Sequence, residues 1–392
     1  MRRVDLLIIG GGINGVGVAQ AAAAAGYSVV LLEKTGLASG TSSRSSKLIH
    51  GGLRYLETAQ FGLVRECLHE RRLLLKNAPE LVKLEPFYIP VYKTTTRSPW
   101  KLRLGLSAYA LLNGLHHGSR FRQVPRSEWE ALDGLNQSGL KAVFQYWDAQ
   151  TDDAKLTTAV MRSAQSLGAE LLMPAEFLSA HKEPHYWQVE FLHEGEKHEL
   201  ECMAIVNAAG PWVNQVLGLM SPQQSPRNIE LVQGTHIILN ESLSHGFYYV
   251  EAPHDKRAVF VMPWYGKVMV GTTETTFHGD PGKVEPSREE LRYLLDTLSY
   301  YFPRFRAFNI KQIEQAFAGI RVLPAAKGSA FKRARDTVYH MDNEFQPSLL
   351  TIYGGKLTAY RATAETVLKK LRPALPPRTT KADTRELTLI PA

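Results

Sequence analysis

The chain has 392 residues, of which 44% are hydrophobic and 21% charged; this globular composition excludes a disordered protein and leaves room for two or three domains. Its two cysteines, Cys67 and Cys202, lie far apart without C-x-x-C spacing, so we expect neither a disulfide scaffold nor a metal site. The net charge of +8 is compatible with an anionic lipid or an anionic substrate, whereas no motif supports binding of nucleic acid.

The sequence contains no run of apolar residues long enough to span a membrane. Its N-terminus, Met1-Arg2-Arg3, leads directly into an apolar run and lacks the features of a cleavable signal peptide. We therefore expect a cytoplasmic protein.

The strongest local pattern lies in the first thirty residues. Residues 4–9 are an apolar run of strand length, residues 16–25 predict a helix of small residues, and residues 29–32 are a second apolar run that ends at Glu33. The first strand and the helix are joined by Gly10-Gly11-Gly12-Ile13-Asn14-Gly15. A glycine turn inside such a βαβ unit, with a carboxylate about 20 residues further on, predicts a dinucleotide site.

Each residue type in this pattern has a physical reason. Gly10 allows a tight turn, Gly12 lets the backbone approach a pyrophosphate, and Gly15 lets the helix pack closely on the strand. The helix N-terminus offers N–H groups and a partial positive charge to phosphates. Glu33 is expected to accept hydrogen bonds from ribose hydroxyls, which disfavours a 2′-phosphate.

Two polar, glycine-containing stretches follow. Residues 38–47 are dense in hydroxyl and N–H groups, as in a loop around phosphates or a ring edge, although a plain flexible loop has the same composition. In residues 48–56, the pair Gly51-Gly52 permits close approach to a flat cofactor. Arg54 and Tyr55 would then supply a cation and a phenol beside it.

Two helices are expected next. Residues 61–77 carry apolar side chains at helical spacing and predict an amphipathic helix. Residues 98–115 contain a tryptophan, two cations and then a nearly uncharged apolar segment. This second pattern is typical of a buried helix, and also of a helix that lies at a membrane interface.

The later elements suggest a second domain. A helix is expected from about residue 152, with Asp152 or Asp153 as its N-cap, and the apolar strand from residue 204 ends in Ala209-Gly210. Residues 229–276 contain short β-rich stretches separated by turns, which predict an antiparallel sheet.

The C-terminal part is expected to contain a helix over 287–301, a strand over 349–353 and a glycine-led helix from 354. Residues 373–381 are rich in proline and cations and predict an exposed tail.

Three cations, Arg54, Arg321 and Lys356, each stand one or two residues after a glycine. If they converge, they fit a phosphorylated or carboxylated substrate, because guanidinium groups pair bidentately with such anions. Each of them taken alone could also be an ordinary surface residue. His236 is a candidate general base with an ordinary pKa of about 6.5, His50 is the alternative, and either could be a structural residue instead.

Eight stretches resemble bacterial FAD-dependent sn-glycerol-3-phosphate dehydrogenase, within the wider family of flavoproteins similar to glycine oxidase and D-amino-acid oxidase. They occur in the expected order from residue 4 to about residue 370. The stretches are GGGINGVGVAQAAAAAGYSVVLLEK, TSSRSSKLIHGGLRYLE, WDAQTDDAKL, VNAAGPWV, GTHIIL, VFVMPW, VGTTETTFHGDP and YGGKLTAYR.

The resemblance implies an α/β fold of mixed α+β character. A glutathione-reductase-like Rossmann FAD-binding domain, residues 1–80, 148–222 and 318–372, would be interleaved with an antiparallel-sheet substrate domain, residues 81–147 and 223–317. Residues 373–392 would be a tail, without the helical C-terminal domain found in family members of the usual length. We therefore expect a more open substrate pocket, or a different substrate.

The resemblance also implies non-covalently bound FAD, with Glu33 on the adenosine ribose and residues 41–47 along the pyrophosphate and flavin. The residues expected to bind FAD are Gly10, Gly12, Ile13, Asn14, Gly15, Glu33, Lys34, Thr41, Ser42, Ser43, Ser46, Lys47, Leu48, His50, Gly51, Gly52, Ala209, Gly210, Trp212, Gly319, Gly355, Lys356, Leu357 and Thr358.

The residues that the resemblance places around the substrate are Arg54, Tyr55, His236, Thr273, Arg321, Arg335 and Lys356. Four of them are the predicted catalytic residues. Arg54, Arg321 and Lys356 would hold the phosphate or polarise hydroxyls. His236 or a partner would take the C2 hydroxyl proton while hydride passes from C2 to flavin N5, and Arg321 is an alternative stabiliser of the developing alkoxide.

The predicted reaction is the oxidation of sn-glycerol 3-phosphate to dihydroxyacetone phosphate, with electrons passed to a quinone. One alternative is a related flavin oxidoreductase acting on a 2-hydroxy acid or an amino acid, and another is a flavin-binding protein without catalysis. The family associates peripherally with the cytoplasmic face of the inner membrane, and residues 98–115 stand where its membrane-dipping stretch lies. A homodimer is left open.

Overall fold

The βαβ unit at the start of the chain forms the centre of a nine-stranded sheet. β1 (Arg2–Ile9) pairs in parallel with β2 (Val29–Leu32) and β10 (Glu196–Asn207). β19 (Leu349–Tyr353) continues the parallel part beside β10, and β7 (Glu170–Leu172) continues it beside β2. The inner strands of this parallel sheet are apolar because both of their faces are covered.

Helices cover one face of this sheet and a β-meander extends its edge. The helices are α1 (Ile13–Ala24), α4 (Asp153–Ser166) and α7 (Tyr360–Leu371). β8 (Ala175–Lys182) and β9 (Trp187–His193) pair antiparallel with each other, and β9 pairs with β10. Every residue of α1 except Asn14 is buried, since its small side chains let it pack closely against the sheet and the two other helices.

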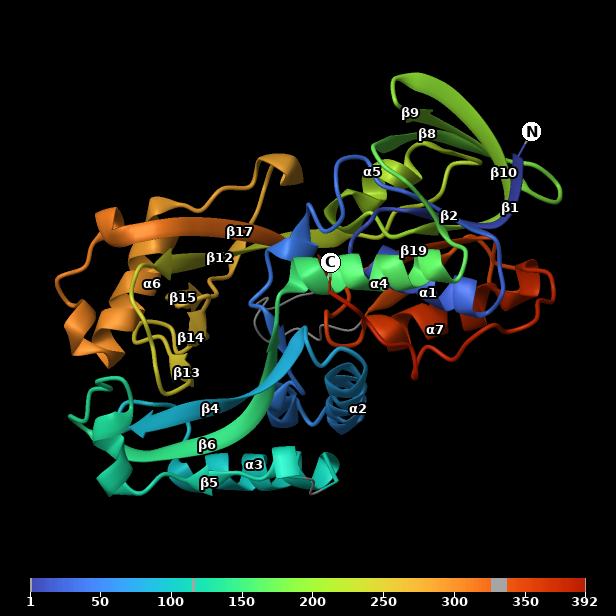
Figure 1. Ribbon diagram of the computed structural model, residues 1–392. Helices are drawn as coiled ribbons and strands as arrows, with labels where there is room; N and C mark the ends of the chain where they lie inside the picture. The colour runs from blue at the N-terminus through green and yellow to red at the C-terminus, as the bar shows by residue number, and fades with distance from the viewer. Residues whose placement is uncertain (1, 115–116, 326–336, 392) are drawn as a thin grey trace.

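The second sheet has ten strands and forms the other lobe of the molecule, on the left in Figure 1. Its strands run in the order β16-β12-β15-β14-β13-β4-β6-β3, with β17 beside β12 and β5 beside β6. The longer strands are β4 (Val82–Tyr92), β6 (Leu140–Thr151), β12 (Ile229–Leu239), β13 (Phe247–Glu251), β14 (Ala258–Trp264), β15 (Lys267–Gly271) and β17 (Ile313–Pro324). The short ones are β3 (Leu48–Ile49), β5 (Arg122–Gln123) and β16 (Thr275–Thr276).

Three helices pack against the second lobe. α6 (Arg288–Tyr301) begins after Ser287, which forms a capping box with Glu290. α2 (Phe61–Asn77) is the predicted amphipathic helix, and α3 (Pro99–Leu112) occupies most of the segment predicted over 98–115.

The first turn of α4 is capped by Asp152, whose side chain accepts a hydrogen bond from the N–H of Lys155.

The structure, a computed structural model, describes residues 2–114, 117–325 and 337–391. Within these ranges, no helix combines the length and the apolar character that a membrane span needs. The predicted domain boundaries at 147/148 and 317/318 fall inside β6 and β17, both of which belong to the second sheet over their whole length. The chain therefore passes from one lobe to the other at the ends of these strands.

The last residues are attached to the first lobe. The side chains of 377–381 are exposed, as predicted for a tail, but the backbone N–H groups of Lys381 and Ala382 donate to the carbonyl of Ala24. Arg378 forms an ion pair with Asp5, with 2.8 Å between Nη2 and Oδ1. Leu389 is buried in the core beneath α1 and α2. The polar stretch is thus exposed as predicted, and it is attached to the first lobe because an apolar anchor follows it.

Substitutions at two adjacent residues, Leu389 and Ile390, test this anchor. Leu389→Ala is expected to lower the free energy of unfolding by about 2 kcal/mol or more, since it removes a buried side chain from the core. Ile390→Ala, which changes an exposed side chain, is the control and should leave stability within about 0.5 kcal/mol. Urea unfolding followed by fluorescence measures both, and equal midpoints would contradict the anchor.

Candidate functional site

A cavity of about 880 Å³ opens between the two lobes. The carboxyl ends of β1, β2 and β10 and the turn after β19 line it from the first lobe. β12, β13, β14 and β17 line it from the second. Ligands of parallel α/β sheets bind at this edge of the sheet, so the cavity is the candidate site.

The glycine turn forms one end of the cavity. Gly10 has φ +107°, and a Cβ there would lie 2.8 Å from the carbonyl oxygen of Ala208. Gly15 lies behind the wall, where a Cβ would lie 1.9 Å from the carbonyl oxygen of Gly10. Gly15 therefore performs its predicted packing role and does not line the cavity with the other turn residues.

Glu33 stands at the end of β2 beside this turn. Its Oε2 accepts the N–H of Gly11 at 2.7 Å, and its Oε1 accepts the N–H groups of Thr35 and Gly36. These bonds fix the carboxylate against the cavity and leave it acceptor capacity for a ligand hydroxyl.

Asn14 joins the first turn to the turn after β19. Its Nδ2 donates to the carbonyl of Gly354 at 2.9 Å, whereas its Oδ1 is buried and accepts no hydrogen bond within the described residues. A buried acceptor of this kind needs a donor. Together with the glycine turn, the start of α1 and Glu33, this unsatisfied oxygen fits the FAD that the sequence predicts.

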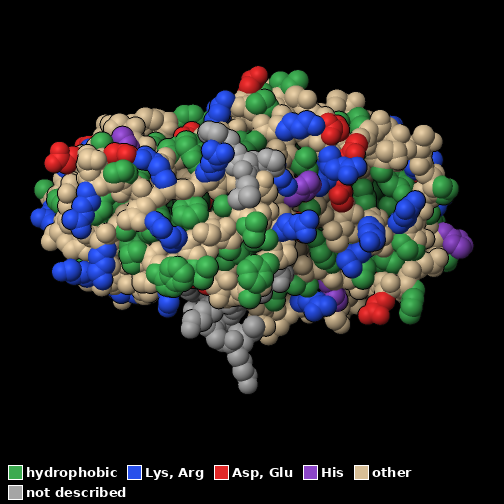
Figure 2. Space-filling view, turned by 90° about the horizontal axis from the view of Figure 1, so that it is seen from below, with side chains coloured by type: hydrophobic (Ala, Val, Ile, Leu, Met, Phe, Trp, Pro, Cys, Tyr) green, Lys and Arg blue, Asp and Glu red, His purple; other side chains and the backbone are tan. Residues whose placement is uncertain are grey.

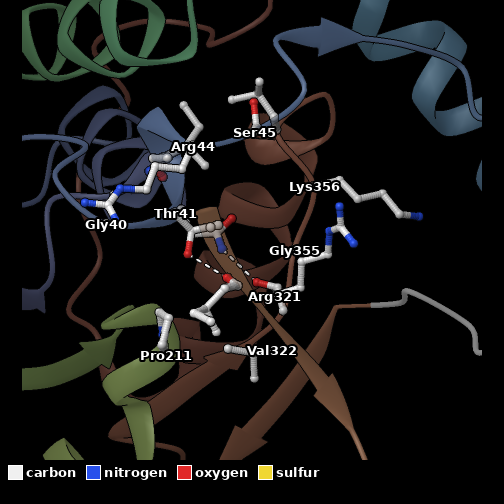
Figure 3. A pocket seen from close by; sticks show the side chains of 18 of the residues that line it. Gly40, Thr41, Arg44, Ser45, Pro211, Arg321, Val322, Gly355 and Lys356 are labelled. Carbon is white, nitrogen blue, oxygen red and sulfur yellow. Dashed lines mark hydrogen bonds between the residues drawn. The ribbon is translucent and has the colours of Figure 1, made fainter. Parts of the chain in front are cut away.

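The loop from Thr41 to Ser46 closes over the same space (Figure 3). Thr41 Oγ1 donates to the carbonyl of Ile320 at 2.7 Å, which ties the loop to β17. Ser42 Oγ accepts the N–H of Ile13 at 2.9 Å and so satisfies one N–H at the start of α1.

Most of the residues predicted to bind FAD line this cavity. They are Gly10, Gly12, Ile13, Asn14, Glu33, Lys34, Thr41, Ser42, Ser46, Leu48, His50, Gly52, Ala209, Gly210, Trp212, Gly319, Gly355, Lys356, Leu357 and Thr358. Gly15, Ser43, Lys47 and Gly51 lie outside the lining. Lys34 lines the cavity but is paired with Glu176 at 2.7 Å.

Lys47 is a structural cation. It is buried, and its Nζ lies 2.6 Å from Asp153 Oδ1 at the start of α4. Asp153 Oδ2 also accepts the N–H and the hydroxyl of Ser45. Lys47 thus lies outside the cavity lining with its charge paired, and its binding to the cofactor stays a prediction.

Gly51 is held from behind by a buried network. Its N–H donates to Tyr109 Oη at 2.9 Å, and Tyr109 Oη donates to Asp148 at 3.0 Å. Burial, followed by the charge of Asp148, raises the pKa of Tyr109 well above its ordinary value, so the phenol keeps its proton. Asp148 is also paired with the fully buried Arg71.

The three predicted cations Arg54, Arg321 and Lys356 all line the cavity. Figure 3 shows the side chains of Arg321 and Lys356 directed into the same space. Arg321 Nη2 donates to Thr272 Oγ1 at 3.1 Å. Lys356 Nζ is buried 4.6 Å from the ring centroid of Tyr55, and within the described residues it makes no hydrogen bond. Lys356 therefore has three N–H donors that an anion could satisfy.

The structure places His236 one layer behind the cavity wall. Its imidazole is 1% exposed, stacks on Phe317 at 4.9 Å and lies against Gly271, where a Cβ would come within 2.0 Å of the ring. Its Nε2 is 2.9 Å from Ser46 Oγ, which does line the cavity. Ser46 thus lies between His236 and the cavity, and contact of His236 with the substrate stays a prediction.

The surroundings of His236 favour its neutral form. Burial, followed by the charges of Arg321 and Lys47, lowers the pKa of its imidazole well below the ordinary value. His236 is therefore neutral at physiological pH. His50, the alternative, lines the cavity, and its backbone N–H donates to Oγ1 of Thr358, which lies just before α7. Of the remaining substrate residues, Tyr55 and Thr273 line the cavity, and Arg335 lies outside the described residues.

Several cavity residues were missed by the sequence reasoning, among them Arg44, Tyr146, Asp148, Tyr249, Arg257, Phe260, Thr272 and Glu274. Tyr249 and Phe260 are neighbours on β13 and β14, and the alternation of those strands could have indicated them. Cys67 also lines the cavity, and burial raises the pKa of its thiol to about 11, so it stays protonated. Among the described residues, no group of three His, Cys, Asp or Glu side chains could hold a metal.

Comparison with known proteins identifies relatives over nearly the whole chain. The family model described as FAD dependent oxidoreductase matches residues 5–361. D-erythritol 1-phosphate dehydrogenase of Brucella abortus is 38% identical over 95% of this chain and 74% of its own length. Glycerol-3-phosphate dehydrogenase of Pseudomonas aeruginosa is 39% identical over 94% of this chain and 72% of its own length.

Solved structures give the same picture of the fold. Glycerol-3-phosphate dehydrogenase from Bacillus halodurans, complexed with FAD, superposes with a TM-score of 0.72 at 27% identity, over 98% of this chain and 69% of that chain. L-alpha-glycerophosphate oxidase from Mycoplasma pneumoniae, with FAD bound, gives a TM-score of 0.77 at 18% identity over the full length of both chains. The second likeness supports the fold alone.

The lowered pKa of His236 predicts a pH-dependent stability. The unfolded chain binds a proton at this residue below its ordinary pKa whereas the folded chain does not, so lowering the pH favours unfolding. Between about pH 7.5 and about pH 5.5, His236 should cost the wild type about 1.4 kcal/mol. His236→Gln should remove this loss, and unfolding at both pH values measures it. An unchanged pH dependence in the variant would show that the folded protein binds a proton at His236 as readily as the unfolded chain does.

Proposed function

The chain belongs to the family of FAD-dependent oxidoreductases, and on that premise we propose that it oxidises sn-glycerol 3-phosphate to dihydroxyacetone phosphate. The observation that carries the proposal is the buried ammonium of Lys356, whose N–H groups lack an acceptor among the described residues in a cavity that it shares with Arg321 and Arg54. A phosphate would satisfy these donors.

FAD is the cofactor, and it supplies an acceptor for the hydride that leaves the substrate. In this chain the glycine turn and the start of α1 would hold its phosphate-bearing part, Asn14 Oδ1 would accept from a donor group of the cofactor, and Glu33 would accept ribose hydroxyls. The loop from Thr41 to Ser46 would cover it.

The substrate's anion and its reacting hydroxyl need different groups. We assign the phosphate to Arg54 and Lys356 and the developing negative charge on the C2 oxygen to Arg321, since Thr272 Oγ1 holds the Arg321 guanidinium in the cavity. His50 would take the proton of the C2 hydroxyl, because it lines the cavity whereas His236 is separated from it by Ser46. Loss of this proton and of the hydride from C2 leaves the ketone.

A second candidate substrate is D-erythritol 1-phosphate, after which the Brucella abortus relative is named. That relative is 38% identical to this chain, as similar as the glycerol-3-phosphate dehydrogenases are. Both compounds present a phosphate and several hydroxyls, so the same cations would serve either of them.

We propose that α3 docks the protein on an anionic membrane, where a quinone would accept the electrons. Trp100, Leu104 and Leu111 are 70%, 58% and 68% exposed and share one face of the helix, while Leu106 and Tyr109 face the interior. Figure 2 looks at this side of the molecule and shows Lys and Arg side chains among apolar ones, with fewer acidic side chains. Exposed apolar side chains on a helix with cations beside them suit a lipid interface.

The substrate proposal predicts bleaching of the bound flavin. Anaerobic addition of glycerol 3-phosphate should bleach the visible absorbance of the wild type, and D-erythritol 1-phosphate is tested in parallel. Arg321→Glu should slow bleaching by about a hundredfold or more while flavin stays bound, because it removes a cation from the reacting oxygen. Arg306→Glu makes the same charge change at an exposed site and serves as the control.

If a 2-hydroxy acid or an amino acid bleaches the flavin and neither polyol phosphate does, that class of substrate replaces the proposed one. Loss of flavin from the Arg321 variant would show that Arg321 is structural.

The membrane proposal predicts flotation with liposomes of anionic phospholipid. Exchanging Trp100 and Leu104 for Asp should reduce the floated fraction about tenfold or more, since it places charge on the apolar stripe. Phe345→Asp changes a side chain that is 87% exposed elsewhere and is the matched control. A wild type that stays at the bottom of the gradient would leave α3 as an ordinary surface helix.

A further inference from the structure

A buried carboxylate stands behind the second lobe's wall of the cavity. Glu290, at the start of α6, is 5% exposed and accepts hydrogen bonds from five groups. Its Oε2 accepts from Gln233 Nε2 at 2.6 Å, Thr235 Oγ1 at 2.9 Å and the N–H of Ser287 at 3.0 Å. Its Oε1 accepts from Thr273 Oγ1 at 2.6 Å and Thr275 Oγ1 at 3.3 Å.

This carboxylate determines where the hydroxyl hydrogen of Thr273 points. A hydroxyl has a single hydrogen, and a carboxylate oxygen can only accept, so Thr273 donates to Glu290. Thr273 Oγ1 also accepts the N–H of Thr235 at 2.8 Å. Because Thr273 lines the cavity, what its hydroxyl can offer there is a lone pair, which accepts a hydrogen bond.

The neighbouring threonine is oriented in the same sense. Thr272 Oγ1 donates to the carbonyl of Thr273 at 3.1 Å and accepts from Arg321 Nη2 at 3.1 Å. The hydrogens of both hydroxyls are therefore used within the protein and are not available to a ligand. This wall presents oxygen lone pairs beside the guanidinium of Arg321.

We propose that Glu290 is a positioning residue for substrate recognition. It acts through Thr273 and makes this wall an acceptor for a substrate hydroxyl, so the uncharged hydroxyl-bearing part of a polyol phosphate lies here and the phosphate lies elsewhere. The phosphate monoester of such a substrate has no hydrogen to donate to Thr273 once it is doubly ionised, and the wall disfavours it. The inference rests on the proposed function and specifies the orientation of its substrate.

Glu290→Gln is the direct test, because glutamine at this position still supports a capping box. The amide oxygen of the introduced glutamine can accept the hydrogen bonds that Oε2 of Glu290 accepts. Its NH₂ group then faces Thr273 and donates to it, which turns the hydrogen of that hydroxyl towards the cavity. The glycerol 3-phosphate concentration that half-saturates anaerobic bleaching should rise about fivefold, the value of one neutral hydrogen bond. Affinity for inorganic phosphate, measured by perturbation of the flavin absorbance, should stay equal or tighten.

Glu289→Gln is the matched control, since Glu289 is the exposed neighbour on the same helix. It should leave both measurements at the wild-type values. If Glu290→Gln weakens glycerol 3-phosphate and inorganic phosphate by the same factor, Glu290 has a general structural role and the inference is overturned.

A double-mutant cycle separates action through Thr273 from any other effect. Thr273→Val should by itself raise the half-saturating concentration about fivefold, Thr273→Ser should not, and adding Glu290→Gln to Thr273→Val should change nothing more. Additive effects, or a valine variant equal to the wild type, would overturn the inference. The comparison of valine with serine also serves if Glu290→Gln does not fold.

The outcome is distinguishable from failure of the proposed function. If no polyol phosphate bleaches the wild-type flavin, the proposed function fails. The phosphate measurement on Glu290→Gln still tests the inference, because weakened binding of inorganic phosphate contradicts it.

Discussion

The cavity depends on the buried ion pair between Arg71 of α2 and Asp148 of β6. Both side chains are almost completely excluded from solvent, and breaking such a pair typically costs about 3–5 kcal/mol because one charge is left uncompensated. Asp148 also accepts from Tyr109 and from the N–H of Gly51. One carboxylate thus joins α2, α3 and β6 to the loop that carries His50 and Arg54. The helix that supplies Tyr109 is α3, whose outer face is exposed, so its two faces have separate roles.

The two ends of the cavity differ in what they offer a ligand. The glycine turn and the start of α1 present backbone N–H groups with one carboxylate, Glu33, whereas the other end collects cations. Arg257, at that other end, already has a carboxylate partner, Glu274, and Lys34, next to Glu33, is paired with Glu176. Lys356 instead lies over the neutral ring of Tyr55. An aromatic face supports a cation without neutralising it, so this charge remains available to a substrate anion.

The sequence predicts the parts of the molecule that are determined by local pattern. The βαβ unit, the glycine turn, α2 and the start of α6 follow from spacing and capping, and most of the predicted cofactor residues line the cavity because the turn fixes them. Residues whose role depends on distant partners could not be placed. Lys47 and His236 are examples, because their partners Asp153 and Ser46 are distant from them in the sequence. Glu290 gave no signal beyond its place in a capping box, since its threonine partners lie on β12 and after β15.

The same separation between local and distant determinants bears on substrate choice. Glycerol 3-phosphate and D-erythritol 1-phosphate share a phosphate and differ in the length of the hydroxylated part, so Arg54 and Lys356 cannot discriminate between them. The wall that contains Thr272, Thr273 and the buried carboxylate of Glu274 offers hydroxyl acceptors and is the part of this cavity that can sense that length. A hydroxyl without an acceptor there would lose its bond to water without replacement, at a cost of about 1–3 kcal/mol. Discrimination between polyol phosphates should therefore lie in the threonine wall and not in the cations.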